Sequence, residues 1–540
     1  MLAFEHALIL LLLIAALSVV ARWLPWPSPI TYLLGGVGAA LLPVFPKLTL
    51  DPGFFFLCFL PPLLFSDGWM MPLREFVKAK RAIFLLAIGL VAFTTLTVGL
   101  VAHWLIPSLP LAMAFALGAI VSPTDAVAVS AITERLRVPA RMSAILSGES
   151  LMNDASGLVA FKFALAAVVA GGFSLRNLVG EFSLIAVGGL LLGLAIGYAI
   201  GKLRDLLRHV HASEPLIENT LSLMTPYAAY LAAEQLHASG VLAVVAAGLY
   251  SGWRDPVRMD AETRQSAFAI WSLVVFWLNG IAFALLGLQF PKILAAVSGQ
   301  YSLLQLAGFT TAVAGAAIIA RIVWVYPATY LPHLFPKVRQ TETRPSKSAV
   351  LIVGWAGMRG TVTLAAALSI PLFLPETTTP FPGRDIVIFL AFGVIAVTLL
   401  LQGTTLEWLI HRLGIREDEN RPKEELLARI TAVDAGLKQL RAMEDSATTQ
   451  EMKASLDAVI EEYDRRLASL TAQGETRAVA RRRRSAGHHY RSAALHAERQ
   501  ALDDLWRDGQ IIDEVHRPLQ QLLDYEESLL KNSSSAVDKD

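Results

Sequence analysis

Residues 148–157 read GESLMNDASG, and residues 158–170 continue as the apolar run LVAFKFALAAVVA. The first stretch carries Glu149, Asn153 and Asp154 at the start of what is otherwise a membrane-like helix. Asp154 lies about eleven residues into a helix expected over 143–169, near the middle of a bilayer at about 1.5 Å per residue. A charge at that depth costs at least about 2.5 kcal/mol, so it indicates a functional or paired group. The alternative is a polar patch that holds helices together.

The composition excludes an ordinary soluble protein. The chain has 540 residues, of which 54% are hydrophobic and 17% charged, and its mean hydropathy is +0.52. The apolar residues form runs of roughly 18–28, each long enough to cross a bilayer as a helix. A transmembrane barrel would need alternating patterns instead. The single cysteine, Cys58, excludes an intrachain disulfide and indicates no metal cluster.

The fold class predicted is an all-α polytopic membrane protein with about thirteen transmembrane helices. The first run lacks a basic start and a cleavage site, so it is interpreted as a retained helix and not as a signal peptide. The expected spans are 2–21, 28–45, 53–71, 83–106, 109–133, 143–169, 178–202, 215–235, 239–252, 267–289, 301–331, 348–374 and 385–411.

Basic residues orient these spans. Loops on one side carry Lys and Arg clusters such as 74–81 and 135–141, whereas the other side holds only Lys47, Arg176, Lys292 and Arg384. The positive-inside rule therefore places the basic loops in the cytoplasm. The expected localisation is the cell membrane, multi-pass, with the N-terminus outside and the C-terminal tail inside.

Charge also divides the chain. Residues 1–414 carry a net charge of +6 and residues 415–540 a net charge of −5. We expect a transmembrane domain over 1–414 and a cytoplasmic helical tail over 415–540, with a regulatory or oligomerisation role. Arg481–Arg484, followed by His488 and His489, could bind acidic lipid or sense pH. A solvated run of charge is the alternative.

Two spans contain helix-breaking polar motifs. Residues 122–130 read SPTDAVAVS, in which Pro123 removes a helical hydrogen bond beside Thr124 and Asp125. Residues 354–365 read GWAGMRGTVTLA, in which Arg359 lies among three glycines. Broken membrane helices offer free carbonyls and helix ends to ions. A simple proline kink is the alternative at Pro123. Arg359 needs a carboxylate partner, for which Glu149 and Asp125 are the candidates.

Other polar residues within spans are less decisive. Asp67 follows Pro61 and Pro62, which are expected to break the third span. It could line an entry funnel or lie solvated at the interface. Asn279 and Arg321 are as compatible with structural as with functional roles. Lys162 lies about 12 Å outward of Asp154, so its side chain is expected to reach the outer interface.

SPTDAVAVS, GESLMNDASG and GMRGTVTLAAALSIP, with LPPLLF and FALLGLQFP, together resemble the monovalent cation:proton antiporter superfamily. The resemblance is to its sodium/proton exchanger branch, NhaP-like in bacteria, and covers roughly residues 5–412. It implies thirteen helices in inverted six-helix repeats, a dimerisation domain, a mobile core domain in which spans five and twelve break and cross, and a homodimer in the bilayer.

The resemblance also assigns roles to residues. Asp154 matches the aspartate that carries the ion and the proton, and Asn153 matches the asparagine that marks the electroneutral branch. Thr124 and Ser150 match oxygen ligands, with Asp125 beside them. Glu149 and Arg359 match a structural ion pair. Ser66 stands where much of the branch has a carboxylate. Asp67 is one residue later, about 100° around the helix.

These observations predict a secondary antiporter rather than an enzyme, with no catalytic residues and no cofactor. It would exchange Na+ or Li+ for H+ one for one, serving pH homeostasis, by competition of a proton and an alkali cation for Asp154. Lys162 near the site could alter the charge stoichiometry. No G-x-x-x-x-G-K-[ST] motif is present, so ion gradients would drive transport. The alternatives are a K+/H+ antiporter, a cation channel, a pH-gated sensor, and an intramembrane aspartyl enzyme using Asp125 and Asp154.

Overall fold

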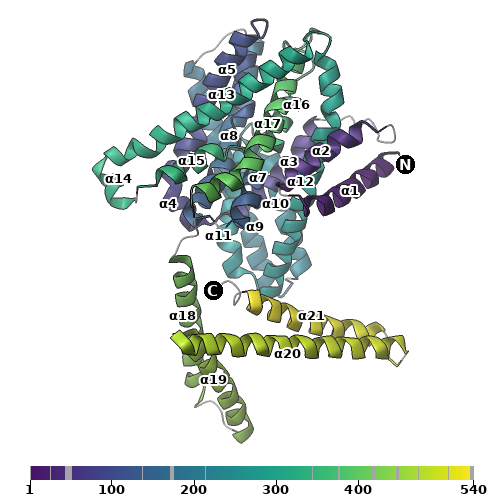
Figure 1. Cartoon of the computed structure of the whole chain (residues 1–540), viewed down its shortest axis with the longest axis vertical. Helices are drawn as coiled ribbons and strands as arrows, with labels where there is room; N and C mark the ends of the chain where they lie inside the picture. Colours follow the sequence, from purple (N-terminus) through teal and green to yellow (C-terminus); the bar gives the residue numbers. More distant parts are fainter. Residues whose placement is uncertain are drawn as a thin grey trace. The chain divides into compact units, whose positions relative to one another are not determined.

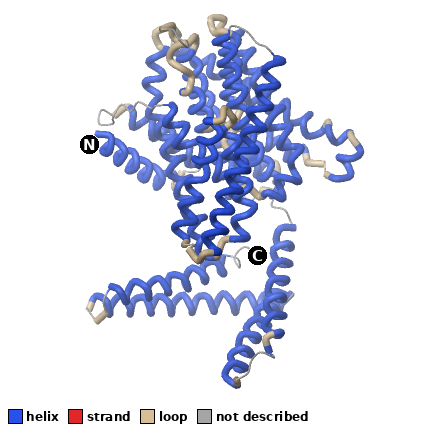
Figure 2. The backbone as a smooth tube through the Cα atoms, turned by 180° about the vertical axis from the view of Figure 1, so that it is seen from behind, coloured by secondary structure: helices blue, strands red, loops and turns tan. Residues whose placement is uncertain are grey.

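The computed structural model describes residues 2–24, 26–42, 52–136, 138–170, 175–212, 214–342, 344–374, 378–415, 420–444, 449–471, 474–508, 510–511 and 513–535. The chain divides into two units, Met1–Glu417 and Asp418–Asp540. The boundary expected at Gly414 lies three residues before this division. Within the described ranges the chain is helical, and the pairing of Phe373 with Pro380 is an isolated bridge rather than a strand (Figure 2).

The first unit is a bundle of apolar helices (Figure 1). In chain order its elements are α1 (Leu2–Ala21), α2 (Ser28–Ala40), α3 (Pro52–Met70), α4 (Leu73–Phe84), the π-helix η1 (Leu85–Leu90), α5 (Val91–Leu105), α6 (Leu111–Val121), α7 (Ala126–Arg135), α8 (Ala140–Ala170), α9 (Leu175–His209), α10 (Pro215–Gln235), α11 (Gly240–Arg258), α12 (Ala261–Val297), α13 (Leu303–Tyr330), the 3-10 helix η2 (Pro332–Leu334), α14 (Pro336–Thr341), α15 (Lys347–Trp355), α16 (Thr361–Leu368) and α17 (Arg384–Arg412).

Six segments of the described chain are long and apolar enough to cross a membrane. They are Leu73–Leu105, Ala140–Ala170, Leu184–His209, Ala261–Val297, Leu303–Leu334 and Arg384–Arg412. Shorter apolar helices cover Leu8–Ala21, Phe56–Met70 and Leu111–Val121. Each of the thirteen predicted ranges falls on a helix or on a broken helix pair. The fold is therefore all-helical, with multiple membrane-spanning segments.

Two groups of helices pack within this unit. In one, α2 packs on α12, and α11 packs on α3, α9 and α10. In the other, α6 packs on α5 and α8, and α13 packs on α5, α15 and α17. Small residues permit the close approach of α2 and α12, since a side chain on Gly36 or Gly287 would overlap the facing backbone. The second group holds the polar motifs of spans five, six and twelve.

The third predicted span differs from expectation. Pro61 and Pro62 do not break α3, which is continuous from Pro52 to Met70. Pro62 has no N–H for the carbonyl of Cys58, four residues earlier. The Tyr227 hydroxyl from α10 donates to that carbonyl at 3.4 Å instead. Neighbouring side chains can satisfy backbone groups freed by proline in a membrane helix, and this one belongs to a distant part of the sequence.

The π-helix η1 was not predicted. Its wide turn leaves carbonyl oxygens that neighbouring helices use: Trp324 Nε1 on α13 donates to Leu85 O at 3.1 Å, and the Ser156 hydroxyl on α8 donates to Ala87 O. π-turns of this kind occur frequently at functional sites. Here the π-helix ties α4–α5 to α8 two residues after Asp154.

The second unit consists of charged helices, α18 (Asn420–Ala442), α19 (Gln450–Thr471), α20 (Gly474–Arg507) and α21 (Asp513–Ser535). The α18–α19 pair is joined by Arg441 and Asp464 at 3.0 Å, and the α20–α21 pair by Arg499 and Asp524 at 2.6 Å. The side chains of Arg481–Arg484, His488 and His489 lie outside the described residues, so the expected lipid-binding or pH-sensing role stays a prediction.

Candidate functional site: two broken helices beside Asp154

Two helices of the first unit are interrupted, and their interruptions lie side by side. Residues 122–125 separate α6 from α7, and residues 356–360 separate α15 from α16. The backbone N–H of Asp125 donates to the Met358 carbonyl at 2.8 Å, and Arg359 Nε donates to the Val121 carbonyl at 2.9 Å. Four helix ends therefore meet inside the bundle, as the family resemblance implied; the residues themselves predicted a break at Pro123 and a weakened helix at the glycines around Arg359.

Arg359 lies at the carboxyl end of α6. Besides the Val121 carbonyl, its guanidinium contacts the Gly357 carbonyl, and its backbone N–H donates to Thr398 Oγ1 at 3.2 Å. The side chain is buried. A cation at a helix C-terminus offsets the negative end of the helix dipole and satisfies carbonyls that lost their helical partners. Arg359 therefore stabilises the break itself.

The carboxylate of Asp125 lies at the N-termini of two half-helices. Its Oδ1 accepts the backbone N–H of Val127 at 2.8 Å, which caps α7. Its Oδ2 approaches the backbone at Gly360, so closely that a Cβ there would overlap the carboxylate. Thr361, the next residue, begins α16. The single negative charge of Asp125 therefore lies at the positive ends of both half-helices.

The helix α8 approaches the break through two hydrogen bonds to one residue. Ser150 Oγ donates to the backbone carbonyl of Thr124 at 2.6 Å, and Asn153 Nδ2 donates to Thr124 Oγ1 at 2.9 Å. All three residues are buried. Ser150 and Asn153 are one helical turn apart and face the same neighbour. They fix Thr124, and with it the loop between α6 and α7, against the helix that carries Asp154.

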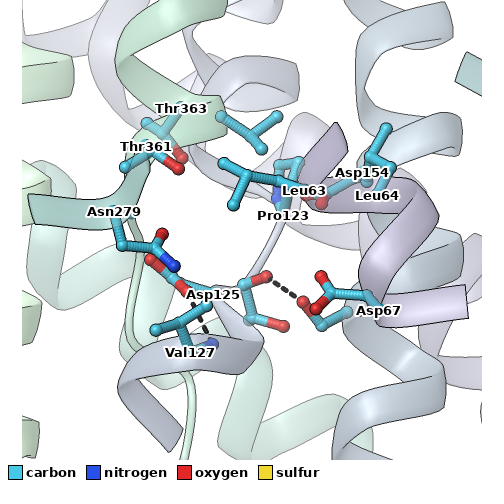
Figure 3. Close-up of a pocket in the computed structure, with 14 residues that line it drawn as sticks. Leu63, Leu64, Asp67, Pro123, Asp125, Val127, Asp154, Asn279, Thr361 and Thr363 are labelled. Atoms are coloured by element: carbon cyan, nitrogen blue, oxygen red, sulfur yellow. Dashed lines mark hydrogen bonds between the residues drawn. The ribbon is translucent and has the colours of Figure 1, made fainter. Parts of the chain in front are cut away.

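Asp154 is buried, with 5% of its surface exposed. Among the described residues, none donates a hydrogen bond to its carboxylate. Asp154 lines a cavity of about 30 Å³ together with Asp67 of α3, Thr124 and Asp125 of the α6–α7 break, Ser150 of α8 and Asn279 of α12 (Figure 3). Since about 10–15 Å³ holds one water, the cavity has room for a small, partly dehydrated ion.

The other cavity-lining groups are polar. In Figure 3, Asn279 and Thr361 lie on one side of the Pro123–Asp125 break, and Asp67 and Asp154 lie on the other. Asn279 is buried, and its Nδ2 has no partner in the described part of the chain. Carboxylate, hydroxyl and carbonyl oxygens are the hard ligands that alkali cations prefer. The cavity is therefore chemically suited to such an ion.

The predicted pair of Glu149 and Arg359 is wrong. Glu149 is paired with Arg321 of α13, which donates from Nη1 to Oε1 and from Nη2 to Oε2, the latter at 2.9 Å. Arg321 also donates from Nε and Nη2 to the Val353 carbonyl of α15 at 3.1 and 2.9 Å. Both members of the pair are buried. The pair joins three helices, α8, α13 and α15.

A physical signal could have chosen the right arginine. Arg359 lies at a helix break, where free carbonyls can satisfy a guanidinium. Arg321 lies inside α13, an unbroken helix whose carbonyls are used. An arginine in an unbroken span therefore has the greater need of a carboxylate.

The chain as a whole matches a known family of membrane proteins. Residues 9–412 match the sequence profile of the family described as "Sodium/hydrogen exchanger, transmembrane". The chain belongs to this sodium/hydrogen exchanger family. It is therefore a multi-pass membrane protein of a transporter family and not an enzyme, which confirms the resemblance seen in the sequence.

Similar proteins with names are also described as cation/proton antiporters. The "Sodium, potassium, lithium and rubidium/H(+) antiporter" of Bacillus subtilis is 37% identical over 534 residues, covering 98% of this chain and 78% of that protein. The antiporter of the same name from Bacillus pumilus is 40% identical over 412 residues, but this match covers 75% of this chain and 61% of the relative. The sodium proton antiporter MjNhaP1 from Methanocaldococcus jannaschii has the same fold, with a TM-score of 0.58 at 19% identity over 76% of this chain and 99% of that one.

Only some of the exchanger's remaining predicted site residues line the cavity. Asp67 lines the cavity despite its one-residue offset, while Ser66 is buried beside it and does not line the cavity. Lys162 is 69% exposed and lies 3.4 Å from Glu234 of α10. Asn153 lies behind Thr124 rather than in the cavity lining. Sequence reasoning missed Thr361, although it lies in a quoted motif, and Thr398, which lies on α17 outside every quoted motif.

Proposed function

We propose that this exchanger carries Na+ or Li+ in exchange for H+, one for one, with Asp154 as the residue that both ions share. The observation that carries the proposal is a difference between three carboxylates inside the helix bundle. Glu149 is held by Arg321, and Asp125 by the N–H groups at the start of α7. Asp154 receives no such bond among the described residues and faces the cavity. Its charge is therefore available for an exchangeable partner.

Exclusive occupancy at one carboxylate would couple the two fluxes. Asp154 is neutralised by a proton or by an alkali cation, and in either form the buried site carries no added charge. The empty, charged form pays the cost of a bare carboxylate at membrane depth. Exchange would then require that one ion leave before the other binds. Thr124 and Ser150, fixed to each other at 2.6 Å, would supply neutral oxygen ligands.

The side-chain charges around the site support electroneutral exchange. Asn153 adds no charge next to Asp154, and Lys162 is exposed and paired with Glu234 rather than with the cavity. Thus one proton would replace one cation. The broken helices α6–α7 and α15–α16 would move with α8 as a core, while α2, α3 and α9–α12 would form the scaffold and the homodimer contact.

We also propose the topology that the basic loops indicate. The thirteen helical segments would form inverted repeats, with the N-terminus outside and the tail in the cytoplasm. Cysteine introduced at Lys423, with Cys58 replaced by serine, tests the location of the tail. Labelling of whole cells by a membrane-impermeant maleimide should occur only after permeabilisation, and labelling of intact cells would reject this orientation.

Exchange of K+ for H+ is a second candidate function. The name of the Bacillus subtilis relative includes potassium and rubidium as well as sodium and lithium. Cation selectivity depends on how well the site replaces the hydration shell of each ion. A cavity of about 30 Å³ favours the smaller cations.

The experiment is cation-induced proton movement in proteoliposomes, measured with a pH-sensitive dye for Na+, Li+ and K+. Asp154→Asn should abolish the signal for every cation. Asp385→Asn is the matched control, because Asp385 is 55% exposed at the start of α17 and far from the cavity-lining set. Both variants should unfold at the same temperature as the parent within a few degrees. Exchange retained by Asp154→Asn would reject the proposed role.

A further inference from the structure

A second and larger cavity lies among the helices of the first unit. Its volume is about 320 Å³, within the 300–1,000 Å³ typical of ligand pockets. It is bounded by the end of α4, the start of α8, the end of α13, the start of α15 and the residues after α17. Figure 1 shows α4, α14 and α15 on the same side of the first unit. None of the ion-site residues lines this cavity.

One part of its wall is basic. Arg81 and Arg141 both donate to the same oxygen, Glu342 Oε2, at 3.0 and 2.8 Å. Two guanidinium groups therefore share one carboxylate oxygen. Arg81 keeps two buried donors, Nε and Nη1, without a partner in the described part of the chain. Buried donors without partners cost free energy, so they indicate a ligand.

His333 adds to this wall. Its Nδ1 lies 2.8 Å from the Thr329 carbonyl, which fixes the ring, and its buried Nε2 has no partner among the described residues. The first turn of α15, capped by Ser346, also lines the cavity. The positive end of that helix dipole adds to the same field. These features suit an anion.

Much of the remaining lining of the cavity is apolar. It includes Leu86, Met142, Ile145, Val350, Val353 and Ile415. A free inorganic anion would leave this surface uncovered, whereas an alkyl chain would bury it at about 25 cal/mol per Å². The basic and the apolar groups together fit a molecule with an anionic head and an apolar chain.

We propose that this cavity binds an amphipathic anion, with a phosphate or carboxylate head on Arg81 and His333 and an alkyl chain along Met142, Ile145 and Val350. Arg135 offers a contrast on the same unit, since it is 59% exposed and paired with Glu407 at 2.9 Å. The ligand could be a membrane lipid or a free amphiphile. Both have the same chemistry, and the experiment separates them.

A short series of hydrogen bonds links the lining of this cavity to α8, the helix that carries the ion site. Val353 lines the cavity, and its carbonyl accepts two hydrogen bonds from Arg321, the partner of Glu149. Met142 and Ile145 belong to α8, the helix that carries Asp154. A bound chain would therefore contact both α8 and α15. On the orientation proposed above, the ligand would enter from the cytoplasmic side.

Binding is tested on the full chain in phosphatidylcholine nanodiscs, with the unfolding temperature followed by tryptophan fluorescence. Decyl phosphate should raise this temperature in a saturable manner, and inorganic phosphate and decanol should not. Arg81→Gln should raise the half-saturating concentration of decyl phosphate at least about tenfold, the loss expected for one charged hydrogen bond. Arg135→Gln should respond as the parent does. An equal effect of inorganic phosphate would overturn the amphipathic assignment.

A second variant tests the proposal even if Arg81→Gln has a folding defect. Ala349→Leu fills the apolar part of the cavity and keeps every charge, so it should abolish the decyl phosphate effect without lowering the unfolding temperature. A parent that shows no shift, or a shift unchanged in both Arg81→Gln and Ala349→Leu, would overturn the proposal. In phosphatidylglycerol nanodiscs, a stabilised parent that no longer responds to decyl phosphate would identify a membrane lipid. A persistent response would identify a free amphiphile.

Discussion

Arg321 and Glu149 form a buried bidentate ion pair between α13 and α8, and Arg321 also holds the Val353 carbonyl of α15. Glu149 lies five residues before Asp154 on α8. The pair therefore sets the position of the ion-site helix against α15, one half of a broken helix. Removing one member would leave the other charged and buried.

Arg321→Ala should consequently destabilise the protein strongly. Breaking a buried pair by removing one partner costs about 3–5 kcal/mol, whereas Lys78→Ala, which removes an exposed pair with Glu75 at 2.7 Å, should cost at most about 1 kcal/mol. Thermal unfolding in detergent, followed by tryptophan fluorescence, compares the two. The double variant Glu149→Leu, Arg321→Met should regain at least half of the loss. A double variant no more stable than Arg321→Ala would contradict this account.

Gly360 offers a test of the crossing of the two broken helices. A Cβ at this position would overlap the Asp125 carboxylate, which lies between α7 and α16. Gly360→Ala should therefore displace Asp125 and reduce the exchange rate at least about tenfold, since small displacements at a site have large effects on rate. Gly308→Ala on α13 is the matched control, because a Cβ there meets open space. Proteoliposome assays at equal protein content measure both, and a Gly360→Ala protein as active as Gly308→Ala would reject the close approach.

Some of this site was predictable from the sequence, for identifiable reasons. Pro123 cannot donate a backbone hydrogen bond, which predicted the first break, and the glycines around Arg359 predicted a weakened helix, which the family resemblance implied to be broken. The expected break at Pro61 and Pro62 did not occur, because the Tyr227 hydroxyl, 169 residues from Cys58, satisfies a carbonyl that proline leaves free. The partner of Glu149 was also missed. Two buried arginines were available, and the free carbonyls at the break around Arg359 were not weighed as its partners.

The position of Asp67 was left open by the sequence. It could line an entry funnel or lie at the interface, and its offset by one residue counted against a role at the ion site, yet it lines the cavity. A helical-wheel argument places a side chain relative to its own helix and says nothing about how that helix is rotated within the bundle. The role of Asp154 as the exchangeable carboxylate stays a prediction from the sequence, to which the structure adds its burial and the cavity beside it.

Asn153 should act on cation affinity through Thr124. Its Nδ2 donates to Thr124 Oγ1 at 2.9 Å, and this bond fixes an oxygen that lines the cavity. Asn153→Ala should raise the apparent KM for Na+ about 3- to 10-fold, equivalent to one hydrogen bond of roughly 1 kcal/mol. Thr124→Ser, which keeps the hydroxyl, should change the KM little, and Thr124→Val should resemble Asn153→Ala. The titration of dye responses with Na+ measures each value. An unchanged KM in Asn153→Ala with an altered maximal rate would assign Asn153 to movement rather than to binding.

Lys162 provides a test of whether the exchange is electroneutral. Its ammonium is 69% exposed and 3.4 Å from Glu234 on α10, away from the residues that line the cavity. An exposed pair of this kind carries little energy and does not need to change protonation during transport. Exchange by the parent protein should therefore be insensitive to an imposed membrane voltage, and Lys162→Gln should behave identically. The measurement is Na+-driven proton movement in proteoliposomes held at two voltages by a potassium gradient and an ionophore. A parent that responds to voltage and loses this response in Lys162→Gln would show that the lysine takes part in the transport cycle, and the one-for-one stoichiometry would have to be abandoned.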